Sequence, residues 1–171
     1  QNNTFTGIIC SIRDVTKRMQ FEKELRESEE NLSITLNSIG DAVIATDRKG
    51  KITRMNAVAE NLTGWNFTEV KGTLLSGIFQ IIHALTRETL ESPVEKVLKK
   101  GETIELANHT LLISRDGTEK QIADSGSPIR NQEGEIIGVV LVFRDVTDKY
   151  KMEEQLRQSQ KMDAVGKLAG G

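Results

Sequence analysis

The chain has 171 residues, of which 37% are hydrophobic and 28% charged, which suits one soluble globular core with some length left for extensions. Its 25 acidic and 23 basic residues leave a net charge of −2, so we expect no affinity for nucleic acid or an anionic membrane. The single cysteine, Cys10, excludes an intramolecular disulfide and a cysteine-based metal cluster, and it suits a reducing cytoplasm.

An internal repeat is the first feature along the chain. Residues 7–28 read GIICSIRDVTKRMQFEKELRES, and residues 138–159 read GVVLVFRDVTDKYKMEEQLRQS, with no gap needed to align them. Each copy predicts an apolar strand, then Asp-x-Thr, then a charged helix. The second strand follows residues that can build a sheet for it, whereas the first does not. We therefore predict that residues 1–15 are the last strand of a preceding domain.

Residues 16–38 have the pattern of a linker or signalling helix. Phe21, Leu25, Ser28 and Leu32 follow one another at alternating steps of four and three, as along a coiled-coil seam. Two interpretations stay open. The stripe is a dimer seam, or it is the apolar side of a solvated helix that packs on its own domain.

Residues 39–147 have an α+β pattern. Helical turns are predicted over residues 65–82, and a clearer helix starts after Ser92, with Glu95 completing a capping box, and ends at Gly101. Short turns join neighbouring strands, so we predict a five-stranded antiparallel sheet with helices on one face. The predicted strands cover residues 41–47, 51–56, 104–114, 118–128 and 135–144.

A short junction separates the last predicted strand from a second signalling helix over residues 148–171. The junction residues are Arg144, Asp145, Val146 and Thr147. We expect Thr147 to be the N-cap, because its hydroxyl can accept hydrogen bonds from the first turn. The apolar stripe continues at Met152 and Leu156 and becomes irregular at Met162. An irregular stripe favours a marginal coiled coil with two nearby packings. The predicted dimer seam thus comprises Phe21, Leu25, Leu32, Met152, Leu156 and Met162.

Two sequence blocks in order, and the junction at the end of the second, resemble a PAS domain over about residues 31–148. They are DAVIATDRKGKITRMNAVAENLTGW, the later block GTEKQIADSGSPIRNQEGEIIGVVLVFRDVT, and the Asp-Val-Thr junction that ends it. The resemblance implies a PAS fold flanked by signalling helices, with Asp145 tying the start of the last helix to the domain core. By the same resemblance, residues 1–15 are the end of a preceding PAS domain.

The tail QKMDAVGKLAGG resembles the start of a histidine-kinase dimerisation helix. The resemblance implies a sensor histidine kinase as the parent protein, with its phosphoacceptor histidine and ATP-binding domain outside these residues. We therefore expect no catalytic residue in the chain itself. The implied partners are a second copy of the chain, the neighbouring PAS domain, the kinase core and, through the parent, a response regulator. A diguanylate cyclase or a chemoreceptor with the same sensor would not be expected to carry this tail.

Ligand chemistry is the least constrained feature of the sequence. Light-sensing flavin chemistry needs a cysteine that residues 39–147 lack, and haem would need His83 or His109 as axial ligand. His83 lies in an apolar run predicted as helical, and we expect both histidines to be packing residues rather than iron ligands. Trp65 and Ser125 complete the candidate pocket, with Trp65 expected to pack and Ser125 to lie on a solvent edge or a wet pocket. The histidines and carboxylates show no metal-ligand spacing.

The sequence thus predicts a sensory PAS module of a two-component histidine kinase. A ligand- or partner-induced change would pass through a dimeric helix to the kinase core. The expected location is the cytoplasm, with no membrane insertion by this chain, and a membrane anchor elsewhere in the parent protein stays open. A ligand-free dimerisation and spacer module is the alternative, and a haem-based gas or redox sensor is a further one.

Overall fold

The computed structural model describes residues 16–38, 40–105 and 109–170, with the side chains of several α1 residues outside the description. The chain divides into two compact units, residues 1–35 and 36–171. The helix α1 (Thr16–Ser38) contains the described part of the first unit, and it covers the range predicted as helical. The strand predicted in residues 1–15 lies outside the described residues.

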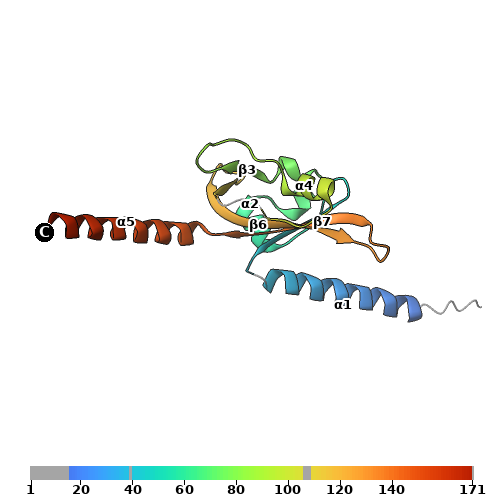
Figure 1. The fold of residues 1–171 in the computed structure, drawn as a ribbon. Helices are drawn as coiled ribbons and strands as arrows, with labels where there is room; N and C mark the ends of the chain where they lie inside the picture. The colour runs from blue at the N-terminus through green and yellow to red at the C-terminus, as the bar shows by residue number, and fades with distance from the viewer. Residues whose placement is uncertain (1–15, 39, 106–108, 171) are drawn as a thin grey trace, which may run out of the picture. The chain divides into compact units, whose positions relative to one another are not determined.

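The second unit is built on one antiparallel sheet (Figure 1). Along the sheet the strands follow the order β2-β1-β7-β6-β5-β3, with β4 paired to β6 beside this path. The strands are β1 (Ala42–Asp47), β2 (Ile52–Met55), β3 (Gln80–His83), β4 (Ile104–Glu105), β5 (Thr110–Ile113), β6 (Glu119–Arg130) and β7 (Ile136–Asp145). The α+β class and the antiparallel sheet are confirmed, but the described sheet has seven strands rather than the five predicted.

Two local differences account for the extra strands. The strand predicted over residues 104–114 is divided into β4 and β5, which pair with different parts of β6. The prediction of a helix around His83 is wrong, because residues 80–83 form β3 and pair with β5 from Gln80 opposite Ile113 to His83 opposite Thr110. A segment of this length is too short to form a stable helix alone, and the edge of β5 provides hydrogen-bond partners for it.

Helices α2 (Ala57–Thr63), α3 (Phe67–Val70) and α4 (Pro93–Lys100), with the 3-10 turn η1 (Leu75–Gly77), connect the strands. Asn56 caps α2 by accepting from the Ala59 N–H at 3.0 Å, and Gly64 ends that helix with φ of 75°. The capping box predicted at the start of α4 does not form, since Ser92 makes no side-chain cap hydrogen bond. Proline at the first position still suits the helix start.

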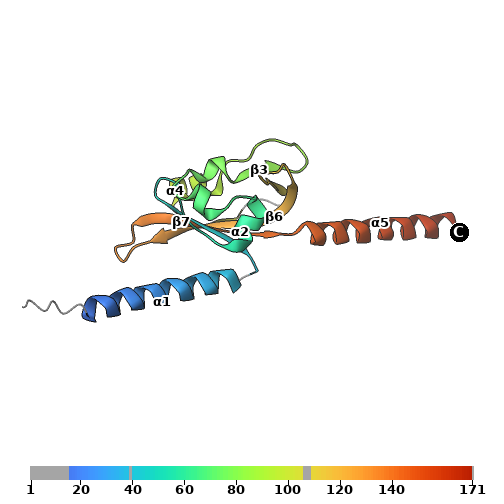
Figure 2. The same cartoon turned by 180° about the vertical axis from the view of Figure 1, so that it is seen from behind.

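The core lies between the sheet and these helices. In Figures 1 and 2, α4 and β3 lie on the same side of the long strands β6 and β7. Gly126 of β6 allows α4 to approach closely, because a Cβ atom there would lie 3.1 Å from Val97 Cγ2. The last helix, α5 (Thr147–Ala169), follows β7 directly and is exposed beyond its first turn. None of the helices in the described ranges has the length and apolar character needed to cross a bilayer.

Candidate functional site

The junction between β7 and α5 is held by a local cap at Asp145. Its Oδ1 atom accepts a hydrogen bond from the Thr147 N–H at 2.9 Å. Because α5 begins at Thr147, Val146 occupies the N-cap position. The prediction that Thr147 is the N-cap is therefore wrong. The carboxylate two residues earlier satisfies the free N–H instead, as in an Asx turn.

Thr147 has a different role, since its hydroxyl connects the helix to the sheet. The Thr147 Oγ1 atom accepts from the Gln121 N–H of β6 at 3.0 Å. The Val146 N–H donates to the Gln121 carbonyl oxygen at 2.8 Å. Both backbone groups of Gln121 are thus used to hold the start of α5. The resemblance assigned the tie between helix and core to Asp145, whereas in the structure Thr147 and Val146 make it.

An ion pair joins the two ends of the domain at the same place. Arg144 donates from Nε and Nη2 to the two carboxylate oxygens of Asp41, at 2.6 and 2.7 Å. Asp41 immediately precedes β1, whose Ala42 pairs with Phe143. The hydrogen bonds from Arg144 and its positive charge hold the pKa of Asp41 below its usual value of 3.8, while partial burial opposes them. A two-point fork of this kind fixes the orientation of both side chains.

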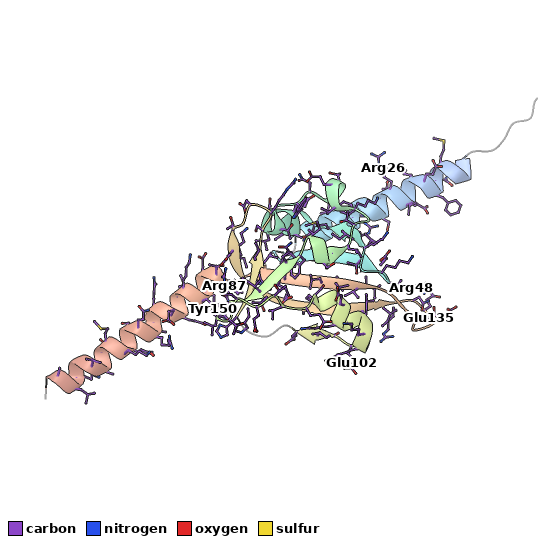
Figure 3. All side chains as sticks on the ribbon, turned by 90° about the horizontal axis from the view of Figure 1, so that it is seen from above. Arg26, Arg48, Arg87, Glu102, Glu135 and Tyr150 are labelled. Atoms are coloured by element: carbon purple, nitrogen blue, oxygen red, sulfur yellow. The ribbon has the colours of Figure 1, made fainter. Side chains whose placement is uncertain are left out.

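A groove of about 740 Å³ lies beside the junction. Ser125, Val142 and Arg144 line it from the sheet, and Tyr150 lines it from the first turns of α5. Figure 3 shows Tyr150 where α5 leaves the domain. The groove borders both the last strand and the output helix, so a molecule bound there would contact both elements. Of the four candidate pocket residues, Ser125 is the one that lines this groove.

The two histidines meet near the start of α5. The ring centroids of His83 and His109 are 6.3 Å apart, and His109 lies 5.8 Å from the ring of Tyr150. His83 Nδ1 accepts from the N–H groups of Leu85 and Thr86, at 3.3 and 3.2 Å. The Nδ1 atom of His83 is thus engaged by the turn that follows β3, and the expectation that both histidines are packing residues stays a prediction.

Trp65 lies elsewhere and packs against Arg115. The guanidinium carbon of Arg115 is 4.0 Å from the centroid of the indole ring, and Arg115 also forms an ion pair with Glu69 at 3.1 Å. This contact attaches the hairpin between β5 and β6 to the helices. Trp65 is therefore separated in role from the histidines and Ser125, and a pocket shared by all four remains a prediction.

The predicted seam residues lie on the two long helices. Phe21 and Leu25 on α1 are 69% and 62% exposed, and Leu32 belongs to α1 but its side chain lies outside the description. On α5 the three seam residues are also largely exposed, namely Met152, Leu156 and Met162. Large exposed apolar side chains in a row on a helix are typical of a surface that is covered by a partner.

Asp41 and Gln121 are the two functional residues that the sequence did not reveal. Asp41 is 103 positions from Arg144, so no local pattern connects them. The β1–β7 register would have indicated the pair, because it aligns the start of β1 with the end of β7. Gln121 acts through its backbone N–H and carbonyl groups, so the identity of its side chain could not indicate this role.

Comparison with known proteins identifies the family. Residues 36–151 match the family described as PAS fold. Among solved structures, the PAS domain of a Colwellia psychrerythraea protein aligns with a TM-score of 0.54 and 19% identity, covering 70% of this chain and 97% of that one. An RNA-binding Light-Oxygen-Voltage receptor aligns with a TM-score of 0.57 and 20% identity, covering 81% of this chain and 38% of that one. At these identities the structural likeness shows the fold alone.

Curated relatives include proteins with different named activities. The chain is 34% identical over 156 residues to the probable diguanylate cyclase DgcE of Escherichia coli, covering 91% of the chain and 14% of the relative. It is 31% identical over 147 residues to the histidine-protein kinase AtoS of Escherichia coli (86% and 23%) and 30% identical over 160 residues to sporulation kinase E of Bacillus subtilis (94% and 20%). The chain thus spans less than a quarter of the length of these relatives.

Proposed function

This chain belongs to the PAS family, and from that premise we propose that it is the sensory and regulatory module of a two-component sensor histidine kinase. The observation that carries the proposal is the hydrogen-bonded junction between β6, β7 and α5. Gln121 holds Val146 and Thr147, while Asp145 caps the helix. A change in sheet packing that moves β6 against β7 would therefore change the start of α5 directly.

The relay uses two nearby states of the output helix. The junction hydrogen bonds are few, and each contributes about 1 kcal/mol net, so ligand or partner binding of ordinary strength can shift their geometry. The apolar stripe on α5 is exposed at Met152, Leu156 and Met162, which suits pairing with the same helix of a second copy. A rotation of the two paired helices then transmits the change to the kinase core.

The kinase output is supported by two independent features. The tail at residues 160–171 resembles the start of a dimerisation helix, and two of the relatives are histidine kinases. The first-named relative is a probable diguanylate cyclase, so a similar segment also occurs in a protein with another named activity. The proposed partners are a second copy of the chain, a preceding PAS domain whose last strand residues 1–15 would supply, the kinase core and a response regulator, and the proposed location is the cytoplasm.

A ligand-free dimerisation and spacer module is the second candidate. It is favoured by the continuous apolar core between sheet and helices, in which residues such as Ile44, Leu112 and Leu141 are fully buried. Such a core has the close packing of a structural interior. An absorbance spectrum of the purified protein, followed by mass spectrometry of its extract, separates the two. A reproducible bound molecule contradicts the spacer, while a featureless spectrum and an empty extract favour it.

The relay itself is tested in the full-length parent protein. We expect Thr147→Val and Asp145→Ala to uncouple autophosphorylation from the stimulus or to fix it at one level, because each removes one hydrogen bond of the junction. Thr68→Val, on an exposed position of α3, is the matched control and should behave as wild type. Unchanged kinase output in both junction variants would show that the relay does not pass through this junction.

A further inference from the structure

Asp124 is a buried acid that the proposed relay does not use. It lies in the middle of β6 and is 9% exposed. Neither of its carboxylate oxygens has a hydrogen-bond partner among the described residues. An unpaired carboxylate in an apolar interior is costly, whereas the neutral acid is tolerated much better. The position therefore favours a proton on Asp124 in the closed domain.

The side chain of Asp124 belongs to the face of β6 that packs against α4. Buried positions alternate along β6 at Ile122, Asp124 and Gly126, and a Cβ on Gly126 would touch Pro93 and Val97 of α4. Directly opposite on β7 is Phe143, which is 1% exposed. The acid thus borders Phe143 and faces α4, and it is also among the residues that line the groove beside the junction.

Lys96 is the charged group that acts on Asp124 from α4, where it is half-buried. The other charged side chains nearby are engaged or belong to a different face. Arg144 is bound to Asp41, and Glu105 is opposite Ser125, whose side chain lies on the other face of β6. On α4, Lys99 is bound to Glu91, and Glu95 lines a separate cavity with Ser92. On β5, Thr110 is uncharged and lies opposite Ile122.

Burial raises the pKa of Asp124 to about 7, while the charge of Lys96 and the backbone N–H of Asp124 itself act in the opposite direction. Since the pKa in the folded domain exceeds the ordinary value, a locally opened state loses the proton at lower pH than the closed state. Opening of this region therefore becomes more favourable as pH rises from about 4 to about 7, by up to about tenfold per pH unit, and levels off above that.

We propose that Asp124 is a proton-responsive element that keeps β6 packed under α4 when neutral and loosens that contact when ionised. Asp124 is three residues from Gln121, and its opposite residue Phe143 is two residues before Asp145. A loosening at this point thus occurs between the two strands that hold α5. Transmission to a kinase rests on the proposed function, but the proton-dependent loosening does not.

The test uses this chain alone, so that it is independent of any kinase output. Carboxyl-detected NMR follows the titration of Asp124, and amide hydrogen exchange, corrected for the intrinsic pH effect, reports opening of α4 and β6. We expect Asp124 to titrate near neutral pH and the opening constant to rise by up to about tenfold per unit between pH 5 and 7. In Asp124→Asn this rise should disappear, whereas Asp163→Asn, at an exposed position of α5, should retain it.

A second variant tests the contribution of α4. Lys96→Gln removes the one opposing positive charge, so the midpoint of the Asp124 titration should move to higher pH. An Asp124 that titrates in the ordinary aspartate range overturns the proposal, as does an opening constant with the same pH dependence in Asp124→Asn as in wild type. An unchanged midpoint in Lys96→Gln contradicts the assigned role of α4.

Discussion

At the scale of single residues, the side chains of Thr147 and Asp145 each accept one backbone hydrogen bond, from the N–H of Gln121 in β6 and from the N–H of Thr147 respectively. Thr147→Val removes the acceptor of the Gln121 N–H, and we expect it to lower the free energy of unfolding by about 1 kcal/mol. Asp145→Ala removes the helix cap and should cost a similar amount. Urea denaturation measures both. Thr147→Ser keeps the hydroxyl and should stay near wild type, and a Thr147→Val protein as stable as Thr147→Ser would contradict this assignment.

The Asp41–Arg144 pair predicts a dependence of stability on pH. Because hydrogen bonds from Arg144 lower the pKa of Asp41, the pair stabilises the fold above the usual aspartate pKa of 3.8. That contribution is lost as pH falls through the lower pKa of the folded state. We expect Arg144→Gln to be less stable than wild type at neutral pH and equally stable at strongly acidic pH. Denaturation curves at several pH values measure this, with the exposed Arg54→Gln as control. A pH-independent difference would mean that Asp41 is not the partner.

The residues of the junction could be located from the sequence, but their roles could not. In Asp-x-Thr before a charged helix, both the Asp and the Thr side chain can cap the helix. Which of them does so depends on the first residue of the helix, and a shift of that residue by one position changes the answer. In the structure β6 supplies a backbone donor that attracts the Thr147 hydroxyl, leaving Asp145 to cap. Asp41 could not be identified at all, because its partner is distant in sequence and becomes adjacent only through the sheet register.

At the scale of elements, the sequence pattern predicted the strands that are bounded by clear turn residues. Gly117 and Gly134 have φ of 84° and 83° in the turns before β6 and β7, as glycine in such turns predicts. The strand β3 was missed because residues 78–85 are apolar without a clear period, and the choice between helix and strand depends on pairing with β5. The residues near β3 in the sequence give no sign of its pairing with a strand that lies about 30 positions further along the chain.

Gly138 tests the packing of β1 against β7. A Cβ atom at this position would clash with the carbonyl oxygen of Thr46 in the neighbouring strand. We expect Gly138→Ala to lower the free energy of unfolding by about 1–3 kcal/mol, because the two paired backbones must move apart to make room for the Cβ atom. Thermal or urea unfolding measures the change. Gly77→Ala is the control, since its Cβ would have no neighbour within 4 Å. Equal stability of the two variants would show that the strands can shift without cost.

At the scale of the whole molecule, the chain enters and leaves the PAS domain at one corner. Asp41 precedes the first strand and Arg144 is the last residue but one of β7, and their ion pair makes both ends part of one structure. The Gln121 hydrogen bonds at the start of α5 are adjacent in the register, since Ile122 is opposite Asp145. A perturbation at this corner thus acts on the start of β1 and the start of α5 together, which is what the proposed relay requires.

Self-association through α5 is the prediction that concerns the assembled protein. Met152, Leu156 and Met162 are 69%, 60% and 74% exposed, and burying one such side chain contributes about 1.5–3 kcal/mol. We therefore expect dimers whose fraction rises with concentration in sedimentation equilibrium. Leu156→Glu should weaken association by about tenfold or more, because it places a charge in the apolar seam. Gln158→Glu adds the same charge two positions away and should leave association nearly unchanged. If both variants sediment like wild type, the stripe on α5 is not the dimer seam, and the helices must transmit their signal without pairing at these residues.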